Sequence, residues 1–344
     1  MSTPRRTGDA WECSFVFDAA RDVEAVSCRG GLVTAGGDEL HVLRAGAQCM
    51  ASRPPPIDLG KVLVVAAEPR APWRYAVAAG DTVAVFYRTD QGDQLLRLSS
   101  SAGPAITRSP PSATHLAWGR EGSASALYIR WDDGAVVRMK QDMSGLDAPD
   151  LPPMDALAAD DAGVLAMISF APPDPRAYVT RDGEQLEYRS VEGTLGPSGR
   201  VHLAVADTAV AYSIDAGGAF VSRASEAPFV RYEALATAGP VEFEGASSDA
   251  ALFGAVMSGG MSGGMSGGMS SGPTGGAASL LRVDAQGNAT LIAEFGSDPA
   301  AVSPSIRALS WDASRHILWG ASPQMGLVTC TAPDAKRSKR IVMS

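Results

Sequence analysis

Few side chains in this sequence have the type and spacing that chemistry needs, and the four histidines are the first candidates. His41, His115, His202 and His316 form no H-E-x-x-H or H-x-x-x-H pair, the spacing that places two imidazoles together on a metal. His115 and His202 each stand at the start of an apolar run, so we expect polar strand-end residues that face the same rim of the fold. A catalytic or metal-binding role is the alternative, because imidazole changes protonation near neutral pH and is a common metal ligand.

The segment 257–276 is a second candidate, because it repeats Met-Ser-Gly-Gly three times before Met-Ser-Ser-Gly-Pro-Thr-Gly-Gly. Chains of glycine and serine lose much conformational entropy on folding and bury little apolar area, so we predict a disordered low-complexity surface loop. Two alternatives stay open. The methionines are adaptable contacts for a partner, or their thioethers are soft ligands that suit Cu(I), from Met257, Met261, Met265 and Met269.

Linear motifs for catalysis and cofactor binding are absent from the sequence. Gly196-Pro197-Ser198-Gly199 lacks the G-x-S-x-G order of a nucleophile elbow. Gly60-Lys61 has Pro55 where a phosphate-binding loop has its first glycine. The sequence therefore predicts no catalytic, cofactor-binding or metal-binding residues, and no cofactor.

The charge balance argues against nucleic acid and membranes as partners. The net charge is −9, so a global positive field is absent, and no window approaches 18 uncharged apolar residues. The basic cluster 336–340 is expected to be a solvated terminus, with a docking handle for an acidic partner or nucleic acid as the alternative. Five aspartates lack the spacing of a calcium-binding loop, and we expect them to lie in a solvated loop between repeats: Asp147, Asp150, Asp155, Asp160 and Asp161.

The cysteines are few and have no C-x-x-C spacing: Cys13, Cys28, Cys49 and Cys330. Arg5-Arg6 is not followed by the apolar stretch of an export signal, because Asp9 and Glu12 interrupt it. We therefore expect reduced structural thiols and a cytoplasmic location. A bridge from Cys13 or Cys28 to Cys330 would require the two ends of the chain to meet.

Alternating apolar runs separated by Gly/Asp turns recur along the chain. In one example, residues 83–87 and 95–98 flank a turn at 90–93. Alternation buries one face of a strand, and Gly or Asp supplies the positive φ of a tight reversal, so each unit predicts a β-hairpin. Seven turn centres lie on average about 48 residues apart, close to the repeat of a propeller blade, near residues 37, 92, 133, 183, 217, 286 and 324.

A further apolar run precedes most of these hairpins and is a candidate inner strand. Small residues are frequent in the runs, as crowded strands around an axis require. The runs are residues 23–26, 62–65, 115–118, 154–158, 202–205, 241–243 and 306–311. Long helical periodicity is missing, although residues 154–162 could form a helical turn confined by Pro152, Pro153 and Gly163.

The hairpins and their spacing resemble a β-propeller, an all-β fold in which four-stranded blades surround an axis. The resemblance implies a single closed β-propeller over residues 11–344 with about seven blades, and six or eight blades as alternatives. It also implies a flexible Gly/Ser/Met loop at 257–276 within the sixth blade and a flexible N-terminus at 1–10.

No standard repeat signature assigns a subfamily. Neither Trp131-Asp132 nor Trp311-Asp312 closes a third strand after Gly-His, as in WD40 repeats, and kelch glycine pairs are absent. The strand that completes the last blade is expected at residues 11–17, which are longer and more apolar than the rival run 340–343.

These expectations favour a non-catalytic protein-interaction scaffold or regulatory subunit, because loops on a rigid frame carry function. The expected partners are one or more proteins, without nucleic acid or membrane, and the sequence indicates no particular small-molecule ligand. Only four of the 29 basic residues are lysine, which suggests a bacterial source. The alternatives are a propeller enzyme of the hydrolase or lactonase type with its site in the central channel, and a substrate or sensor of a partner protease or signalling system.

Overall fold

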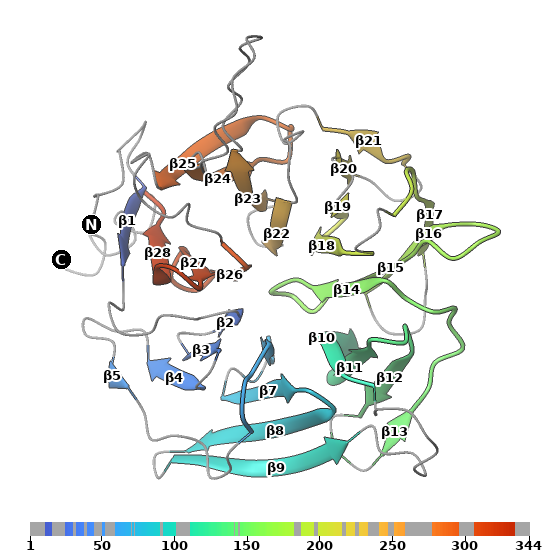
Figure 1. Ribbon diagram of the computed structural model, residues 1–344, viewed down its shortest axis with the longest axis vertical. Coiled ribbons are helices and arrows are strands. Elements are labelled where there is room, and N and C mark those ends of the chain that lie inside the picture. The colour runs from blue at the N-terminus through green and yellow to red at the C-terminus, as the bar shows by residue number, and fades with distance from the viewer. Residues whose placement is uncertain are drawn as a thin grey trace, which may run out of the picture.

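The structure is a computed structural model of the 344-residue chain, in which β-strands and their turns account for the described residues (Figure 1). No helix occurs in this part of the chain, so none there could span a membrane. The described residues are 11–15, 25–29, 32–37, 40–44, 50–51, 59–69, 71, 73–89, 92–100, 111–140, 142–143, 145–181, 187–195, 199–214, 218–223, 227–232, 241–246, 251–258, 277–295 and 306–333.

The described strands form seven four-stranded sheets, in which consecutive strands pair antiparallel. The first sheet holds β2 (Ala25–Arg29), β3 (Leu32–Gly36), β4 (His41–Arg44) and β5 (Met50–Ala51), and the second holds β6 (Val64–Ala67), β7 (Arg74–Ala79), β8 (Thr82–Thr89) and β9 (Gly92–Ser100). The third holds β10 (Ala113–Glu121), β11 (Ala124–Trp131), β12 (Val136–Met139) and β13 (Leu146–Asp147), and the fourth holds β14 (Ala156–Ala159), β15 (Leu165–Ser169), β16 (Arg176–Thr180) and β17 (Glu187–Ser190). The fifth holds β18 (Val201–Ala206), β19 (Ala209–Ile214), β20 (Gly218–Ser222) and β21 (Val230–Arg231), and the sixth holds β22 (Val241–Ala246), β23 (Ala251–Ser258), β24 (Ala277–Val283) and β25 (Ala289–Phe295). The seventh combines β26 (Ala308–Asp312), β27 (Ile317–Ser322) and β28 (Gly326–Thr331) with β1 (Glu12–Phe15).

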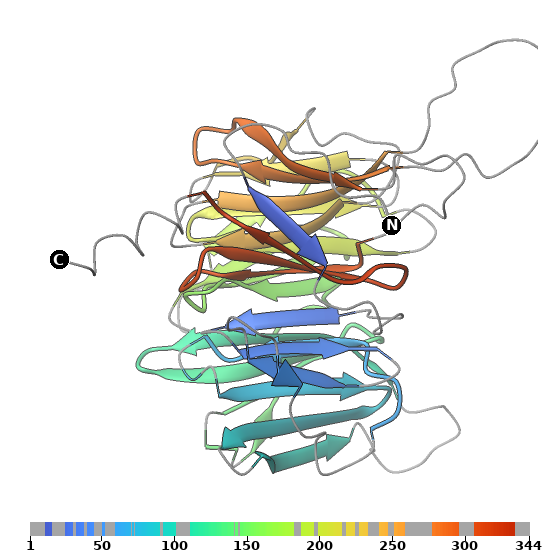
Figure 2. The ribbon, with the colours of Figure 1, turned by 90° about the vertical axis from the view of Figure 1, so that its left-hand side faces the viewer.

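The inner strands β2, β6, β10, β14, β18, β22 and β26 surround a common axis (Figure 1). Each contacts the inner strand of the next sheet, and β26 contacts β2. Seen from the side, the sheets stack into a disc (Figure 2). This is a β-propeller arrangement, so the prediction of an all-β propeller with four-stranded blades is confirmed.

The disc has two faces that follow from the strand order. Every inner strand begins on one face, here called the entry face, and ends on the other, the exit face. Because successive strands reverse direction, the turn between the second and third strand of each sheet also lies on the entry face. Glycine carbonyls in these turns accept a backbone N–H at the start of the next inner strand, from Val62 to Gly37 at 2.7 Å, from Ala113 to Gly80 at 2.8 Å and from Met154 to Gly134 at 2.8 Å.

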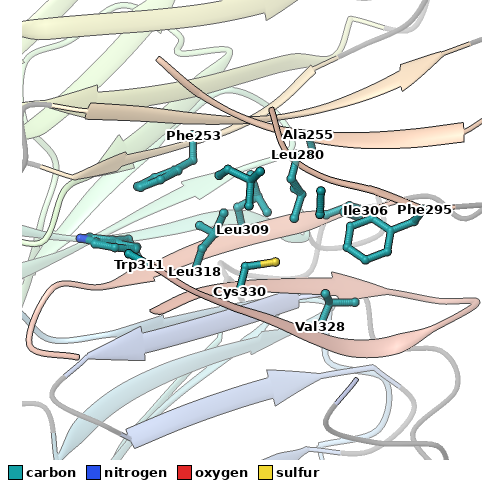
Figure 3. Close-up of a cluster of buried hydrophobic side chains, with 13 residues drawn as sticks. Phe253, Ala255, Leu280, Phe295, Ile306, Leu309, Trp311, Leu318, Val328 and Cys330 are labelled. Atoms are coloured by element: carbon teal, nitrogen blue, oxygen red, sulfur yellow. The ribbon is translucent and has the colours of Figure 1, made fainter. Parts of the chain in front are cut away.

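The apolar core lies between neighbouring sheets. Between the sixth and seventh sheets, Phe253 packs on Trp311 with ring centroids 4.8 Å apart, and Leu280, Leu318 and Cys330 fill the same cluster (Figure 3). Similar clusters join other neighbouring sheets. Because both faces of a sheet are covered, its strands need not alternate in polarity, and all five residues of β15 are buried.

The two ends of the chain meet in the seventh sheet. The N-terminal strand β1 pairs with β28, as the sequence predicts for residues 11–17, although the strand ends at Phe15. The rival run 340–343 lies outside the described residues. Cys13 stands opposite Cys330, and the two form a disulfide with their Cα atoms 4.0 Å apart. The expectation of reduced thiols is therefore wrong for this pair, because the pairing of β1 with β28 brings together two cysteines that are 317 residues apart.

Two other expectations differ from the structure. Residues 154–162 form no helical turn, because 156–159 is the inner strand β14 and pairs with β15. The seven predicted turns are also not equivalent. Those near residues 92, 183 and 286 lie between third and fourth strands, whereas the other four lie between second and third strands.

Gly245 in β22 marks a very close approach of two inner strands. A Cβ at this position would lie 1.6 Å from the carbonyl oxygen of Val205 in β18, so the backbone would have to move. We expect Gly245→Ala to lower the free energy of unfolding by about 3 kcal/mol. Gly145→Ala is the matched control, because no described atom lies within 4 Å of its Cβ position. Denaturant titration measures both, and equal stability of the two variants would contradict the prediction.

The disulfide makes stability depend on redox conditions. Cross-links that close long loops stabilise proteins by about 2–5 kcal/mol, and this one spans 317 residues. We expect a reductant to lower the Tm of the wild-type protein and to leave the Cys13→Ser/Cys330→Ser double variant unchanged. Thermal denaturation with and without reductant provides the measurement. Four free thiols in native protein trapped by alkylation would show that the bond does not form.

Candidate functional site

A cavity of about 300 Å³ lies on the axis of the disc, and all seven inner strands contribute to its wall. Most of the wall is apolar and much of it is small, as at Ala66, Ala117 and Ala158. The polar members of the wall are Ser27, Thr114, His115, Asp160, His202, Glu244, Arg307 and Ser310. The chemistry available in the channel depends on which of these are already engaged.

The two carboxylates of the cavity hold backbone groups together. Asp160 is fully buried, and one of its oxygens accepts the N–H groups of Ala162 and Val164, both at 2.9 Å. Its other oxygen accepts the N–H of Asp207, after β18, at 3.0 Å. Glu244 in β22 likewise accepts the N–H of Trp311 in β26 at 3.1 Å. Both carboxylates therefore join neighbouring sheets.

Uncharged groups of the wall have the same role between the first three sheets. The hydroxyl oxygen of Ser27 in β2 accepts the N–H of Ala67 in β6 at 2.8 Å. The indole N–H of Trp118 in β10 donates to the carbonyl of Ala66 at 3.1 Å. The polar wall thus satisfies backbone groups that the crowded inner strands would otherwise leave unpaired.

His115 is half-buried at the entry-face end of the cavity. Its Nδ1 is hydrogen-bonded to the hydroxyl of Thr114 at 3.2 Å, and the oxygen of that hydroxyl accepts a hydrogen bond from Arg130 at 2.5 Å. Arg130 donates in addition to the Met154 carbonyl at 2.6 Å. Burial, and then the charges of Arg130 and His202, lower the pKa of His115 to about 3. The imidazole is therefore neutral near pH 7.

His202 lines the same cavity from β18, so the expectation that His115 and His202 face one rim is confirmed. The other two histidines lie elsewhere. His41 begins β4, and His316 is in the turn after β26 with its ring centroid 6.0 Å from that of Trp311. The channel thus brings together two of the four histidines.

The aspartates expected in a solvated loop have separate environments. Asp147 accepts two hydrogen bonds from Arg138, at 2.6 and 2.8 Å, and these lower the pKa of its carboxyl. Asp155 accepts the N–H of Phe170 at 2.7 Å. For Asp160 the expectation is wrong, because its buried carboxylate organises the turn after β14.

No group of three or more His, Cys, Asp or Glu side chains within the described part of the chain is placed to hold a metal ion. Gly60 and Lys61 are exposed residues before β6. Met257 lies in β23, but the other methionines of the proposed Cu(I) set, residues 196–198 and the basic cluster 336–340 fall outside the described residues.

Three residues of this site have no motif in the sequence: Thr114, Arg130 and Arg307. Arg307 directly precedes β26, is exposed, and reaches the cavity from the entry face. Only the position of Arg307 at the start of a predicted inner strand could have identified it from the sequence. A polar residue at the start of an inner strand lies at the channel mouth, which is the rule that located His115 and His202.

Neither a protein-family model nor a curated protein matches the sequence. Solved structures do match the fold. The WD40 repeats of RRP9 align with a TM-score of 0.63 at 11% identity, over 93% of this chain and 97% of that one. A chain of the mitotic checkpoint complex aligns with a TM-score of 0.59 at 12% identity, over 96% and 94%. At such identities the likeness concerns the fold alone, and it gives this chain a propeller architecture similar to that of WD40 proteins.

The lowered pKa of His115 predicts a loss of stability in acid. Its pKa returns to about 6.5 on unfolding, so below that pH the unfolded chain binds a proton that the folded chain does not, and stability falls as the pH falls towards 3. We expect His115→Gln to remove on the order of 1 kcal/mol of the stability lost between pH 7 and pH 5. Denaturant unfolding at several pH values measures this effect. An unchanged pH dependence in the variant would refute it.

Proposed function

We propose that this chain is a non-catalytic protein-interaction scaffold or regulatory subunit whose outer surface binds one or more proteins. The observation that carries the proposal is a group of exposed large apolar side chains at one corner of the second sheet. This group, the apolar corner, consists of Trp73, Tyr87, Leu95 and Leu96, each between 37% and 42% exposed.

Backbone pairing places the four residues at the same end of the second sheet, where Tyr87 and Leu95 leave opposite faces of it. The N–H of Arg88, next to Tyr87, donates to the Trp73 carbonyl at 2.6 Å, and Leu95 pairs with Phe86. All four side chains lie towards the exit face, since β7 begins, β8 ends and β9 begins there. Clustered exposed apolar side chains mark interaction sites, and Trp and Tyr are enriched among residues that dominate binding energy.

The rest of the molecule supports this function. The channel carboxylates are used to join sheets, which gives a rigid frame for surface recognition. One of the similar folds is part of the mitotic checkpoint complex, and a place in a protein assembly for this chain is in keeping with that neighbour.

The proposal includes the finer architecture. We take the seven sheets as seven blades of one closed ring over residues 11–344, with 1–10 outside the ring. The insertion predicted at 257–276 in the sixth blade starts after residue 258, because Met257 and Ser258 end β23. The contact of β26 with β2 and the pairing of β1 with β28 support closure. Limited proteolysis tests these bounds, since cuts are expected in 1–10 and 259–276 before any cut in the sheets.

A cytoplasmic location in a bacterium stays part of the proposal, and the disulfide makes it testable. Cytosolic thiols are kept reduced. Native protein recovered from cells with the Cys13–Cys330 bond already formed would assign it to an oxidising compartment instead.

The scaffold function predicts a companion that depends on the apolar corner. We expect Trp73→Ser/Tyr87→Ser to reduce recovery of the companion at least about tenfold, because two aromatic contacts are lost. Val230→Ser is the matched control, since Val230 is 63% exposed but lies in β21 of the fifth sheet. The measurement is quantitative mass spectrometry of proteins cross-linked to the chain in its native cell. No stable companion, or one retained equally by both variants, would rule out this surface.

A further inference from the structure

We propose that the entry-face end of the channel cavity binds a small aliphatic monocarboxylate, whose carboxylate group contacts Arg307, His115 and His202. This site goes beyond the proposed protein-binding function and does not depend on it, because the apolar corner lies towards the exit face, away from the entry-face end of the cavity.

Arg307 supplies the positive charge. It lies directly before β26, its side chain is exposed, and it lines the cavity. Among the described residues, no carboxylate forms an ion pair with its guanidinium. A guanidinium matches a carboxylate with two parallel hydrogen bonds, which is the strongest contact available to this group.

His115 and His202 supply further polar contacts from the opposite wall. Both are half-buried near the entry-face ends of β10 and β18, so they converge with Arg307 on one cavity. A neutral imidazole has a single N–H and donates it without adding charge. In the proposed site Nδ1 of His115 accepts the Thr114 hydroxyl, whose oxygen is held by Arg130, so the N–H of His115 is on Nε2 and donates to the ligand. The donors are therefore preorganised before any ligand arrives.

The wall beyond these donors suits a short apolar chain. Ala66, Leu157 and Ala158 line the cavity from β6 and β14. A volume of about 300 Å³ is at the small end of ligand sites, which favours a chain of few carbons. The ligand is thus polar at one end and apolar at the other.

The other charged groups of the cavity and its rim favour a ligand with one carboxylate over a ligand with two. Asp160 follows the last residue of β14, and Glu244 is in β22; both accept backbone N–H groups. Asp155, on the entry face, accepts the Phe170 N–H and acts electrostatically on Arg130. A second carboxylate on the ligand would be repelled by these groups, so a dicarboxylate binds less well than a monocarboxylate.

Titration of the purified full-length chain with butanoate, followed by calorimetry and by the histidine ring signals in NMR, tests the proposal. We expect saturable binding that shifts the signals of His115 and His202, and weaker binding of succinate. Butan-1-ol and butylamine are the matched probes without a carboxylate. Equal binding of either one, or no saturable binding of butanoate, would overturn the proposal.

Two variants test the contacts. Arg307→Gln is expected to weaken butanoate binding at least about tenfold, whereas Arg120→Gln, an exposed exit-face arginine, leaves it unchanged. Ala158→Leu fills the apolar wall while keeping every charge, and is expected to abolish binding with the Arg307 side chain intact. Thermal denaturation verifies that each variant is folded, and wild-type affinity in either Arg307→Gln or Ala158→Leu would overturn the site.

Discussion

Seven strands meet around one axis, and each must approach its two neighbours closely. At Gly245 the backbone of β22 lies so near β18 that a side chain does not fit, and β6 and β14 consist largely of alanine and valine or leucine. Backbone groups brought this close have little access to water and need partners. Asp160, Glu244 and Ser27 provide them by accepting N–H groups from a neighbouring sheet or the strand end beside it. The polar wall of the channel is thus a consequence of crowding at the axis.

This crowding separates the surfaces that are available for recognition. At the exit-face end of the channel, Asp160 is buried and occupied by backbone groups. At the entry-face end, His115, His202 and Arg307 line the cavity near the starts of their inner strands. The apolar corner lies at the exit-face end of the second sheet, away from the cavity mouth. A rigid frame can therefore present two chemically different sites on one disc.

Local patterns in the sequence were sufficient for the inner strands and for one hairpin in each sheet, but not for the remaining strands, such as β7 and β15. Each of the seven predicted inner runs overlaps an inner strand, because alternation and Gly/Asp turns are properties of neighbouring residues. The pattern could not tell which turn joined which pair of strands, since a third-to-fourth turn such as that near residue 183 uses the same residue types as a second-to-third turn. The prediction of a helical turn at 154–162 was wrong. The helix propensity of nine residues stabilises a turn less than the pairing of β14 with β15 stabilises a strand.

The site depended on long-range contacts that the sequence does not display. His115 and His202 could be placed at one rim from their positions at strand starts, and the same rule would have found Arg307. The disulfide and the inward carboxylate of Asp160 could not be found this way. Each depends on residues that the ring brings together, as with Cys13 and Cys330 from opposite ends of the chain.

The sixth sheet can accept extra residues between β23 and β24. Ser258 and Ala277 are directly paired, so the strands β23 and β24 hold the two ends of the intervening segment one strand spacing apart. The entropy of closing a chain between two fixed ends grows only slowly with its length. Additional residues between β23 and β24 therefore lower the stability of the sheet very little. A foreign peptide or epitope can be inserted there, and it would lie on the same face of the disc as the channel mouth.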